Sequence, residues 1–348
     1  GISSIEGMAY GVVMGGALQL IWQVPSLLRT GFAFRPMIDW NDPGLRRIIS
    51  LMGPAILGSA AVQINIVVNT NFASSIVDAV RGANGPVSWL GCAFRFMQLP
   101  LGLFGVAMAT ATLPAISRSA ASGNFDEFRV TISRSLATVL LLTVPSSVGL
   151  TVLGKSIIGA IYQGGAFELY DTQQTAAALS YFAIGLLGYA GIKVLTPAFY
   201  ALNDARTPMV VSVASVVINY LAAAYMVHRA GAGHAGLALA TSIVALFNFL
   251  VLFVVLRAKL SGIYGRALVA SVWKVVVAAM AMGVVVAGSN ALVAHLLGVT
   301  RTAYLADLAL TIPTGLLVFY YVGKLLGIPE LEPAFRALAR PVLRRLRR

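Results

Sequence analysis

The chain has 348 residues, of which 58% are hydrophobic and only 11% are charged. A soluble domain carries about 25% charged residues, so this composition excludes an ordinary soluble protein and indicates a polytopic membrane protein. The net charge of +13 agrees better with the excess of basic residues on the cytoplasmic side of membrane proteins than with nucleic-acid binding, so we expect no nucleic-acid partner.

Nine apolar segments are each long enough to cross the hydrocarbon core, which takes about 20 helical residues. In chain order they cover about residues 7–28, 52–77, 87–115, 135–153, 175–202, 209–228, 233–256, 268–297 and 303–326. Lipid offers no hydrogen bonds to the backbone, so these segments predict helices and an all-α fold. Polar stretches with Gly, Pro and Asn, such as "NDARTP", separate them.

The basic residues predict the orientation of these segments. If the loops alternate between two sides, 18 of the 25 basic residues fall on the side of the carboxyl-terminal tail. The four on the other side are Arg81, Lys155, Arg229 and Arg301, and the three within segments are Arg95, Lys193 and Lys274. Cytoplasmic loops are rich in Lys and Arg, so the tail is predicted to be cytoplasmic. Gly1 then lies outside with no signal peptide before it, so we expect a longer protein with an odd number of crossings before it.

Arg95, in "GCAFRFMQLP", lies about eight residues into its apolar segment, where a guanidinium is costly to bury. Its fork of donors suits a phosphate or pyrophosphate, which indicates a substrate-binding group in a cavity. The alternative is a structural bond to carbonyls of another helix. Gln98, three residues later, shares the helix face of Arg95 and would line the same cavity. Pro100 removes one helix hydrogen bond, which predicts a bend.

Four further polar or charged residues lie in or near the predicted membrane segments. Asn65 and Asn69 are four residues apart and share a helix face. They predict hydrogen bonds between helices, a cavity wall or a cation site, and the sequence leaves these alternatives open. Lys193 lies well inside its segment, either as a second cation of the cavity or in a hydrated crevice. Asp204 is interpreted first as the cap of a helix that starts near Thr207.

The twelve carboxylates argue against an enzyme. None lies at the middle of a segment, whereas general acid–base chemistry on a lipid-linked sugar needs at least one positioned carboxylate. The three histidines lack the spacing of metal ligands, and no glycine-rich phosphate loop is present. We therefore expect no catalytic residue, no metal and no cofactor. The single cysteine, Cys92, excludes an internal disulfide.

Three long stretches of the sequence stand out: "MGPAILGSAAVQINIVVNTNFASS", "RFMQLPLGLFGVAMATATLPAISRSAASGNFDEF" and "IYQGGAFELYDTQQTAAALSYFAIGLLGYAGIKVLTPAFYALNDARTP". They resemble the MurJ (MviN) family of lipid II flippases. The similarity extends over about residues 7–258, and the last two segments are similar mainly in hydropathy. The resemblance implies the fold of the multidrug/oligosaccharidyl-lipid/polysaccharide exporter superfamily, with two six-helix lobes and two extra helices.

The resemblance also implies a domain organisation. Residues 1–30 would hold the last helix of a first lobe, 31–51 a cytoplasmic linker, 52–258 the six-helix C-terminal lobe, 259–328 the two extra helices and 329–348 a basic cytoplasmic tail. Five family helices would precede the chain, in agreement with the odd number expected from the charges. The tail is typical of a segment that binds anionic headgroups or one that only anchors the topology.

The resemblance further implies roles for single residues. Arg95 matches an arginine thought to hold the lipid II pyrophosphate. By their own chemistry and spacing, Lys193, Gln98 and Asn65 would line the same cavity. Asn69 stands where some members carry an Asp of a sodium site, to which Asp204 would still contribute. Coupling to Na⁺ or to the membrane potential is therefore expected.

These observations predict the C-terminal part of a lipid II flippase of the bacterial cytoplasmic (inner) membrane. It would translocate the undecaprenyl-linked peptidoglycan precursor by alternating access. The expected partners are lipid II, membrane lipids and proteins of cell-wall synthesis. One alternative is a multidrug or polysaccharide exporter of the same superfamily, although an exporter of cations would prefer an acidic cavity. Another is a non-transporting scaffold for cell-wall assembly.

Overall fold

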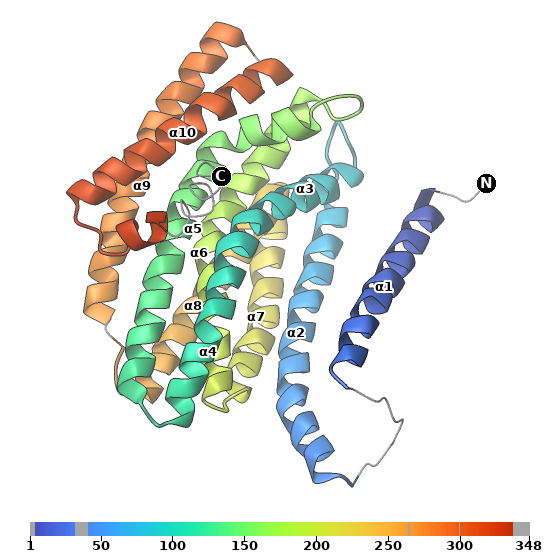
Figure 1. Cartoon of the computed structure of the whole chain (residues 1–348). Helices are drawn as coiled ribbons and strands as arrows, with labels where there is room; N and C mark the ends of the chain where they lie inside the picture. The colour runs from blue at the N-terminus through green and yellow to red at the C-terminus, as the bar shows by residue number, and fades with distance from the viewer. Residues whose placement is uncertain (1–3, 32–40, 264, 299, 337–348) are drawn as a thin grey trace. The chain divides into compact units, whose positions relative to one another are not determined.

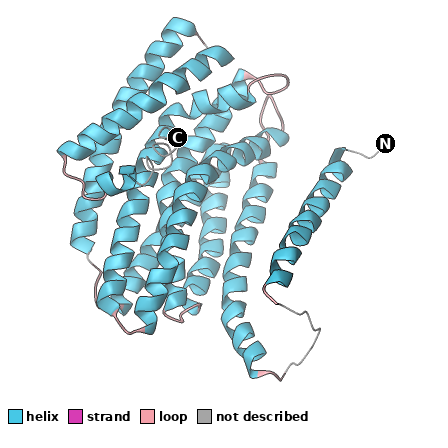
Figure 2. Cartoon of the chain, in the orientation of Figure 1, coloured by secondary structure: helices cyan, strands magenta, loops and turns pink. Residues whose placement is uncertain are grey.

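The computed structural model describes residues 4–31, 41–263, 265–298 and 300–336. Within these ranges every named element is a helix (Figure 1 and Figure 2). Nine helical stretches of this described part are long and apolar enough to cross a membrane. The predicted all-α polytopic fold is therefore confirmed.

Two short π-helices occur within the apolar stretches, so two of the spans contain more than one element. In chain order the elements are α1 Ser4–Arg29, α2 Pro43–Ser75, α3 Asn84–Pro100, the π-helix η1 Leu101–Val106, α4 Ala107–Ala121, α5 Phe125–Tyr162, α6 Leu169–Ala201, α7 Arg206–Ala224, the π-helix η2 Tyr225–Arg229, α8 Gly233–Lys259, α9 Gly265–Leu297 and α10 Arg301–Leu325. The elements α3, η1 and α4 form one span, and α7 with η2 forms another.

The chain divides into two compact units, Gly1–Ser50 and Leu51–Arg348. The first unit holds α1 and the start of α2, and the described side chains of α1 are exposed. Because α2 begins at Pro43, a helix takes the last part of the predicted linker 31–51, of which residues 32–40 lie outside the described residues.

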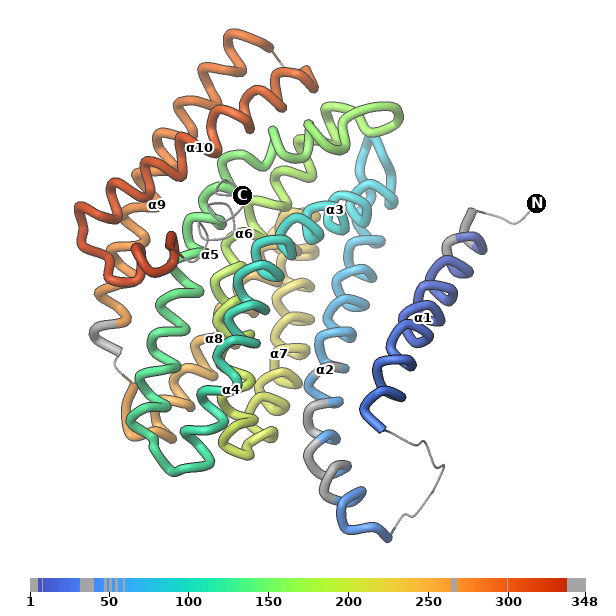
Figure 3. Tube along the Cα trace, viewed as in Figure 1, coloured from blue at the N-terminus to red at the C-terminus, as the bar shows by residue number. Residues whose placement is uncertain are grey.

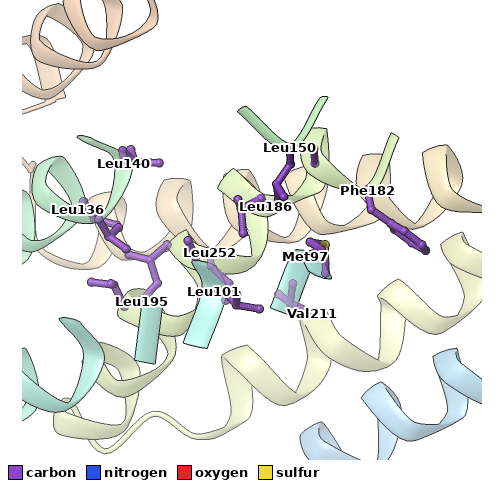
Figure 4. Packing of buried hydrophobic residues seen from close by; sticks show 14 of the residues in the cluster. Met97, Leu101, Leu136, Leu140, Leu150, Phe182, Leu186, Leu195, Val211 and Leu252 are labelled. Carbon is purple, nitrogen blue, oxygen red and sulfur yellow. The ribbon is translucent and has the colours of Figure 1, made fainter. Parts of the chain in front are cut away.

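The second unit is built around α6, which packs against α3, α4, α5 and α8 (Figure 3). Buried apolar side chains, among them Met97, Leu101, Leu136, Leu186 and Leu252, fill the space between these helices (Figure 4). In a membrane such packing stabilises the bundle through van der Waals contact, since lipid tails are as apolar as the side chains.

Glycines on α6 allow its backbone to approach α8 closely. Gly185, Gly188 and Gly191 recur every three residues on the face toward α8. A Cβ at Gly188 would lie 2.6 Å from the carbonyl carbon of Ala245, so the backbone contact requires glycine there. Small residues at such positions are typical of tightly packed membrane helices.

Pro100 ends α3 and is followed by a change of helix type. Proline has no backbone N–H, so it cannot donate to the carbonyl one turn earlier. From Leu101 to Val106 the backbone adopts the wider π-helical turn before α4 resumes the α-helical form. The change of helix type thus begins directly after Pro100, the residue at which the sequence predicts a bend.

The last two helices, α9 and α10, pack on each other and on α5. A second group of buried apolar side chains, among them Leu141, Val275, Phe319 and Leu331, fills the contact. Residues 331–336, at the start of the predicted tail, are helical and pack on this group through Leu331. Residues 337–348 lie outside the described residues.

Candidate functional site

One face of α3 and the start of η1 carries small or polar residues. Ser88, Gly91, Arg95, Gln98 and Gly102 follow one another at intervals of three or four residues, and all five are exposed. We call this face the polar stripe. A face toward lipid would be apolar, so the polar stripe indicates a surface covered by water or by protein.

Arg95 places a positive charge on the polar stripe. It lies 11 residues after Asn84, the first residue of α3, or about 16 Å along the helix axis. Its guanidinium forms no ion pair with any residue that the structure describes. Such a charge at membrane depth requires contact with water or with an anion from outside the chain. Gln98 is exposed on the same stripe, as its spacing from Arg95 predicts.

Lys193 is exposed on α6 beside the π-helix η1. A Cβ at Gly105 would lie 3.7 Å from Cγ of Lys193, so the apolar stem of the lysine rests on η1. Among the described residues, its ammonium group has no ion-pair partner. Gly105 is ten residues beyond Arg95 in the same span, or about 15 Å along a helix, so the two cations lie near different turns of that span.

Asn65 and Asn69 are partly buried on one face of α2, as their spacing predicts. The Nδ2 of Asn69 donates to Oγ1 of Thr241 on α8 at 3.0 Å, and its Oδ1 accepts from Nδ2 of Asn219 on α7 at 3.0 Å. The Oδ1 of Asn65 is buried and lacks a hydrogen-bond partner within the described ranges. Asn69 therefore takes part in hydrogen bonds between helices.

Asp204 lies before α7 and binds its first turn. Its carboxylate accepts from the backbone N–H of Thr207 at 3.0 Å and pairs with Lys259 at the end of α8. Partial burial opposes ionisation, but the hydrogen bonds from Lys259 and Thr207 hold the pKa of Asp204 below its ordinary value of 3.8. Asn219 lies 15 residues further along, about 22 Å on a helix, so the structure does not bring Asn69 and Asp204 into one site.

A second polar cluster joins the α2–α3 loop to the start of α6. Arg81 binds Asp171 through two hydrogen bonds, from Nε at 3.0 Å and from Nη2 at 2.6 Å. The indole of Trp89 donates to the same carboxylate at 3.0 Å. The Asp171 carboxylate raises the pKa of Arg81, and the hydroxyl of Tyr170 holds the pKa of Asp78 below its ordinary value. The charged groups of Arg81, Asp171 and Asp78 each have a hydrogen-bond or ion-pair partner, which indicates that this cluster has a structural role.

The structure connects two further residues to the candidate site that the sequence patterns do not mark. Asn219 and Thr241 each lie within an apolar segment and bind Asn69. Polar side chains inside such segments are the signal that would have identified them. The identity of their partner was out of reach, because it lies 150 and 172 positions away in the chain.

The membrane-spanning helices, and two cations without an ion-pair partner among the described residues, define a class, namely a multi-pass α-helical membrane protein with a cationic polar surface on its spans. A sequence model of the lipid II flippase MurJ family matches residues 1–306. The probable lipid II flippase MurJ of Vibrio cholerae is 36% identical over 262 residues, which cover 74% of this chain and 47% of that protein. The chain therefore belongs to the MurJ family of lipid II flippases. It spans about half the length of the curated relatives it matches.

Solved structures support the same fold. A lipid II flippase MurJ in an inward closed conformation matches with a TM-score of 0.66 and 24% identity, over 90% of this chain and 60% of that one. An outward-facing transporter of the multidrug resistance MATE family matches with a TM-score of 0.50 and 14% identity, over 83% of this chain and 67% of that one. At these identities the likeness concerns the fold alone.

Proposed function

We propose that this chain forms part of a flippase that carries lipid II across the bacterial cytoplasmic membrane. The observation that carries the proposal is the exposed guanidinium of Arg95, which has no partner among the described residues and lies about 16 Å along α3. Lipid II joins an undecaprenyl chain to a disaccharide-peptide through a pyrophosphate, and a guanidinium binds such a group through two parallel hydrogen bonds. Membership of the MurJ family supports this choice of substrate.

In this proposal the headgroup binds along the polar stripe. Arg95 holds the pyrophosphate, and Gln98, one turn later, donates hydrogen bonds to the headgroup. Lys193 adds positive charge beside η1. Asn65 would contribute its amide oxygen only after a movement of the helices exposes it, because this oxygen is buried and lacks a partner within the described ranges. Rocking of the surrounding helices would expose the bound headgroup to either side in turn. The cycle consists of binding and release without covalent chemistry, so the protein acts as a transporter and no catalytic residue is assigned.

A resident sodium ion does not fit the hydrogen-bonded group of Asn69, Asn219 and Thr241, which we call the Asn69 cluster. The Nδ2 atoms of Asn69 and Asn219 already donate to the oxygens that would face an ion. The buried Oδ1 atoms of Asn219 and of Asn65, one turn before Asn69, lack partners, and no carboxylate contacts the cluster in the described part of the chain. We therefore assign the driving force to the membrane potential. An inside-negative potential favours outward movement of an anion by about 2.3 kcal/mol per charge per 100 mV.

We also propose how the chain is oriented in the membrane. The loops rich in Lys and Arg and the carboxyl-terminal tail lie in the cytoplasm, and Arg81 and Arg301 lie on the opposite side. Lipid II is then taken up near the basic loops and released on the side of Arg301. Membrane lipids surround the apolar faces, and proteins of cell-wall synthesis are the expected neighbours that supply and consume lipid II.

The test replaces Arg95 in the full-length protein. In cells that depend on it, Arg95→Ala should abolish the appearance of lipid II at the outer face and stop growth. Arg95→Lys keeps the charge but loses the fork, so it should retain part of the activity. Arg118→Ala removes an exposed arginine near the end of α4 and is the matched control, with unchanged flipping expected.

The alternatives give different results in the same experiment. Normal growth of Arg95→Ala cells at wild-type protein levels would refute the assignment and favour a non-transporting scaffold. Unchanged lipid II flipping with loss of export of another compound would favour a multidrug or polysaccharide exporter. A cationic stripe disfavours cationic drugs as substrates, because like charges repel in a medium of low polarity.

A further inference from the structure

The first turn of α10 holds an arginine that is bound to α5. Arg301, the first residue of α10, donates from Nε to the backbone carbonyl of Ala160 at 3.1 Å. Its two Nη atoms form no hydrogen bond or ion pair within the described ranges. The bond to α5 therefore orients the side chain, while its terminal nitrogens remain available to an anion.

Two further donors lie at the same turn of α5. The ring of Tyr304 covers Gly159, where it leaves no room for a Cβ. Only 6% of Tyr304 is exposed, and its buried hydroxyl has no hydrogen-bond partner among the described residues. Helical side chains lean toward the amino terminus of their helix, so this hydroxyl is aimed at the turn that holds Arg301. Lys155 is one turn before Gly159 on the same face of α5, half-buried and without an ion-pair partner in the described part of the chain.

The start of α10 adds a positive potential to these groups. Thr300 caps the helix, since its hydroxyl accepts from a backbone N–H of the first turn at 3.2 Å. The other N–H groups of that turn lack intrahelical acceptors, and the aligned peptide dipoles place partial positive charge there. The carboxylate of Asp307 on the same helix is bound at 2.7 Å by an amide of α9 and a hydroxyl of α10. Arg301 and Lys155 therefore remain without a paired acid within the described ranges.

Apolar side chains continue the same face of α10 along its span. Leu305 and Ile312 follow Arg301 by four and eleven residues, which is helical spacing, and they are 53% and 46% exposed. The face thus carries donors at the end of the span and apolar surface beyond them. A free phosphate would use only the donors, whereas a phospholipid matches both, with its phosphate at Arg301 and an acyl chain along Leu305.

The geometry points to a binding site for an anionic phospholipid at the amino-terminal end of α10. The phosphate accepts from the Nη groups of Arg301, and Lys155 supplies a second positive charge. The hydroxyl of Tyr304 donates to a phosphate oxygen that enters between α5 and α10. The site lies on other helices than the polar stripe, and its existence does not depend on lipid II transport. In the orientation proposed above, the bound lipid belongs to the outer leaflet and bridges α5 and α10.

The first test measures lipid binding to the full-length protein by native mass spectrometry. Phosphatidylglycerol is added to the delipidated protein in detergent, and zwitterionic phosphatidylcholine is the comparison lipid. Arg301→Ala should weaken the tightest binding of phosphatidylglycerol about fivefold, as expected for one basic residue at a membrane surface, and should leave phosphatidylcholine unaffected. Arg229→Ala removes an exposed arginine at the end of η2 and is the matched control, with unchanged binding. Equal effects of the two variants would overturn the proposal.

A second variant covers the case in which Arg301→Ala fails to fold. Tyr304→Phe removes a hydroxyl without a partner among the described residues, so the melting temperature in detergent without phospholipid should not fall. Phosphatidylglycerol should raise the melting temperature of the wild type more than that of Tyr304→Phe, because only the wild type donates this hydrogen bond to the phosphate. Equal shifts, or a lower melting temperature of Tyr304→Phe without lipid, contradict the proposed role of the hydroxyl.

Competition identifies the source of the phosphate. Inorganic phosphate should not displace phosphatidylglycerol from the wild type, because it lacks an acyl chain, and displacement would show that the site takes free phosphate instead. Preferential binding of undecaprenyl pyrophosphate at equal concentration would assign the site to a polyprenyl lipid and overturn the phospholipid. Arg95→Ala should bind phosphatidylglycerol as the wild type does, so this site and the proposed transport of lipid II are tested separately.

Discussion

Asn219 on α7 donates its amide to the Oδ1 of Asn69 on α2 at 3.0 Å, across 150 positions of the chain. Asn69 in turn donates to Thr241 on α8 at 3.0 Å, so three helices meet at a neutral junction. Interhelical hydrogen bonds of this kind contribute about 0.6 kcal/mol each in a membrane. The junction therefore joins the helices without needing an ion to balance a charge.

The first prediction follows from this neutrality. Lipid II flipping by the full-length protein in vesicles should proceed at the same rate in sodium and in potassium salts. Collapse of the membrane potential should slow it by more than about tenfold, because the potential acts on the anionic headgroup. The rates are measured with a headgroup-labelled substrate. A strict sodium requirement would show that an ion binds despite the amide pairs.

The second prediction concerns the contact between α6 and α8. Gly188→Ala places a Cβ 2.6 Å from the backbone of Ala245 and should destabilise the protein by about 1–3 kcal/mol. Gly149→Ala is the matched control, because nothing lies within 4 Å of its Cβ on α5. It should be neutral or slightly stabilising, since alanine favours helices. Thermal unfolding in detergent measures both, and equal melting temperatures would contradict the close contact.

The third prediction concerns Asp171, whose carboxylate accepts from Arg81 and from Trp89. Asp171→Ala leaves both donors without this acceptor and should lower the melting temperature by about 5 °C or more. Glu168→Ala also removes an ion-pair partner of Arg81, at 3.2 Å, but that side chain is 65% exposed. Its loss should have a smaller effect, since exposed ion pairs contribute little and the capping-box hydrogen bond of Glu168 at the start of α6 contributes about 1 kcal/mol. A larger fall of the melting temperature in Glu168→Ala than in Asp171→Ala would contradict this prediction.

The fourth prediction is a pH dependence at Asp204. Its pKa is lower in the folded protein than the ordinary value of 3.8, so its ionised form stabilises the fold. This contribution is fully present above that value and is lost as the pH falls through the folded pKa. Asp204→Asn should therefore melt below the wild type at pH 7, and the difference should shrink as the pH falls below 3.8. Asp126→Asn, at an exposed carboxylate in the first turn of α5 that pairs with Arg129, controls for the loss of a negative charge.

Much of the fold could be predicted from local patterns in the sequence. Apolar runs of about 20 residues leave few choices other than a helix in lipid. The spacing of Arg95 and Gln98 placed both on one face of α3, and Pro100 marked the change to η1. These inferences rest on neighbours in the chain, which is why the sequence alone supports them.

The hydrogen-bond partners and the burial of polar side chains depend on contacts between segments that are distant in the chain. Asn69 was open to three interpretations because its partners lie on α7 and α8. Asp307 was counted as lying away from the middle of its segment, and only the packing of α5 and α9 around α10 shows how completely it is buried. Burial of a polar side chain is a property of the assembled helices, which no local pattern specifies.

The polar stripe from Ser88 to Gly102 also limits how annular lipids can arrange themselves around these helices. Acyl chains cannot solvate the guanidinium of Arg95 and the amide of Gln98, so contact with lipid would remove the hydration of both groups. The ring of bound lipids must therefore stop at either edge of α3 and leave a gap. Whatever closes that gap, water or polypeptide, sets the path by which a large headgroup could pass without its tail leaving the bilayer.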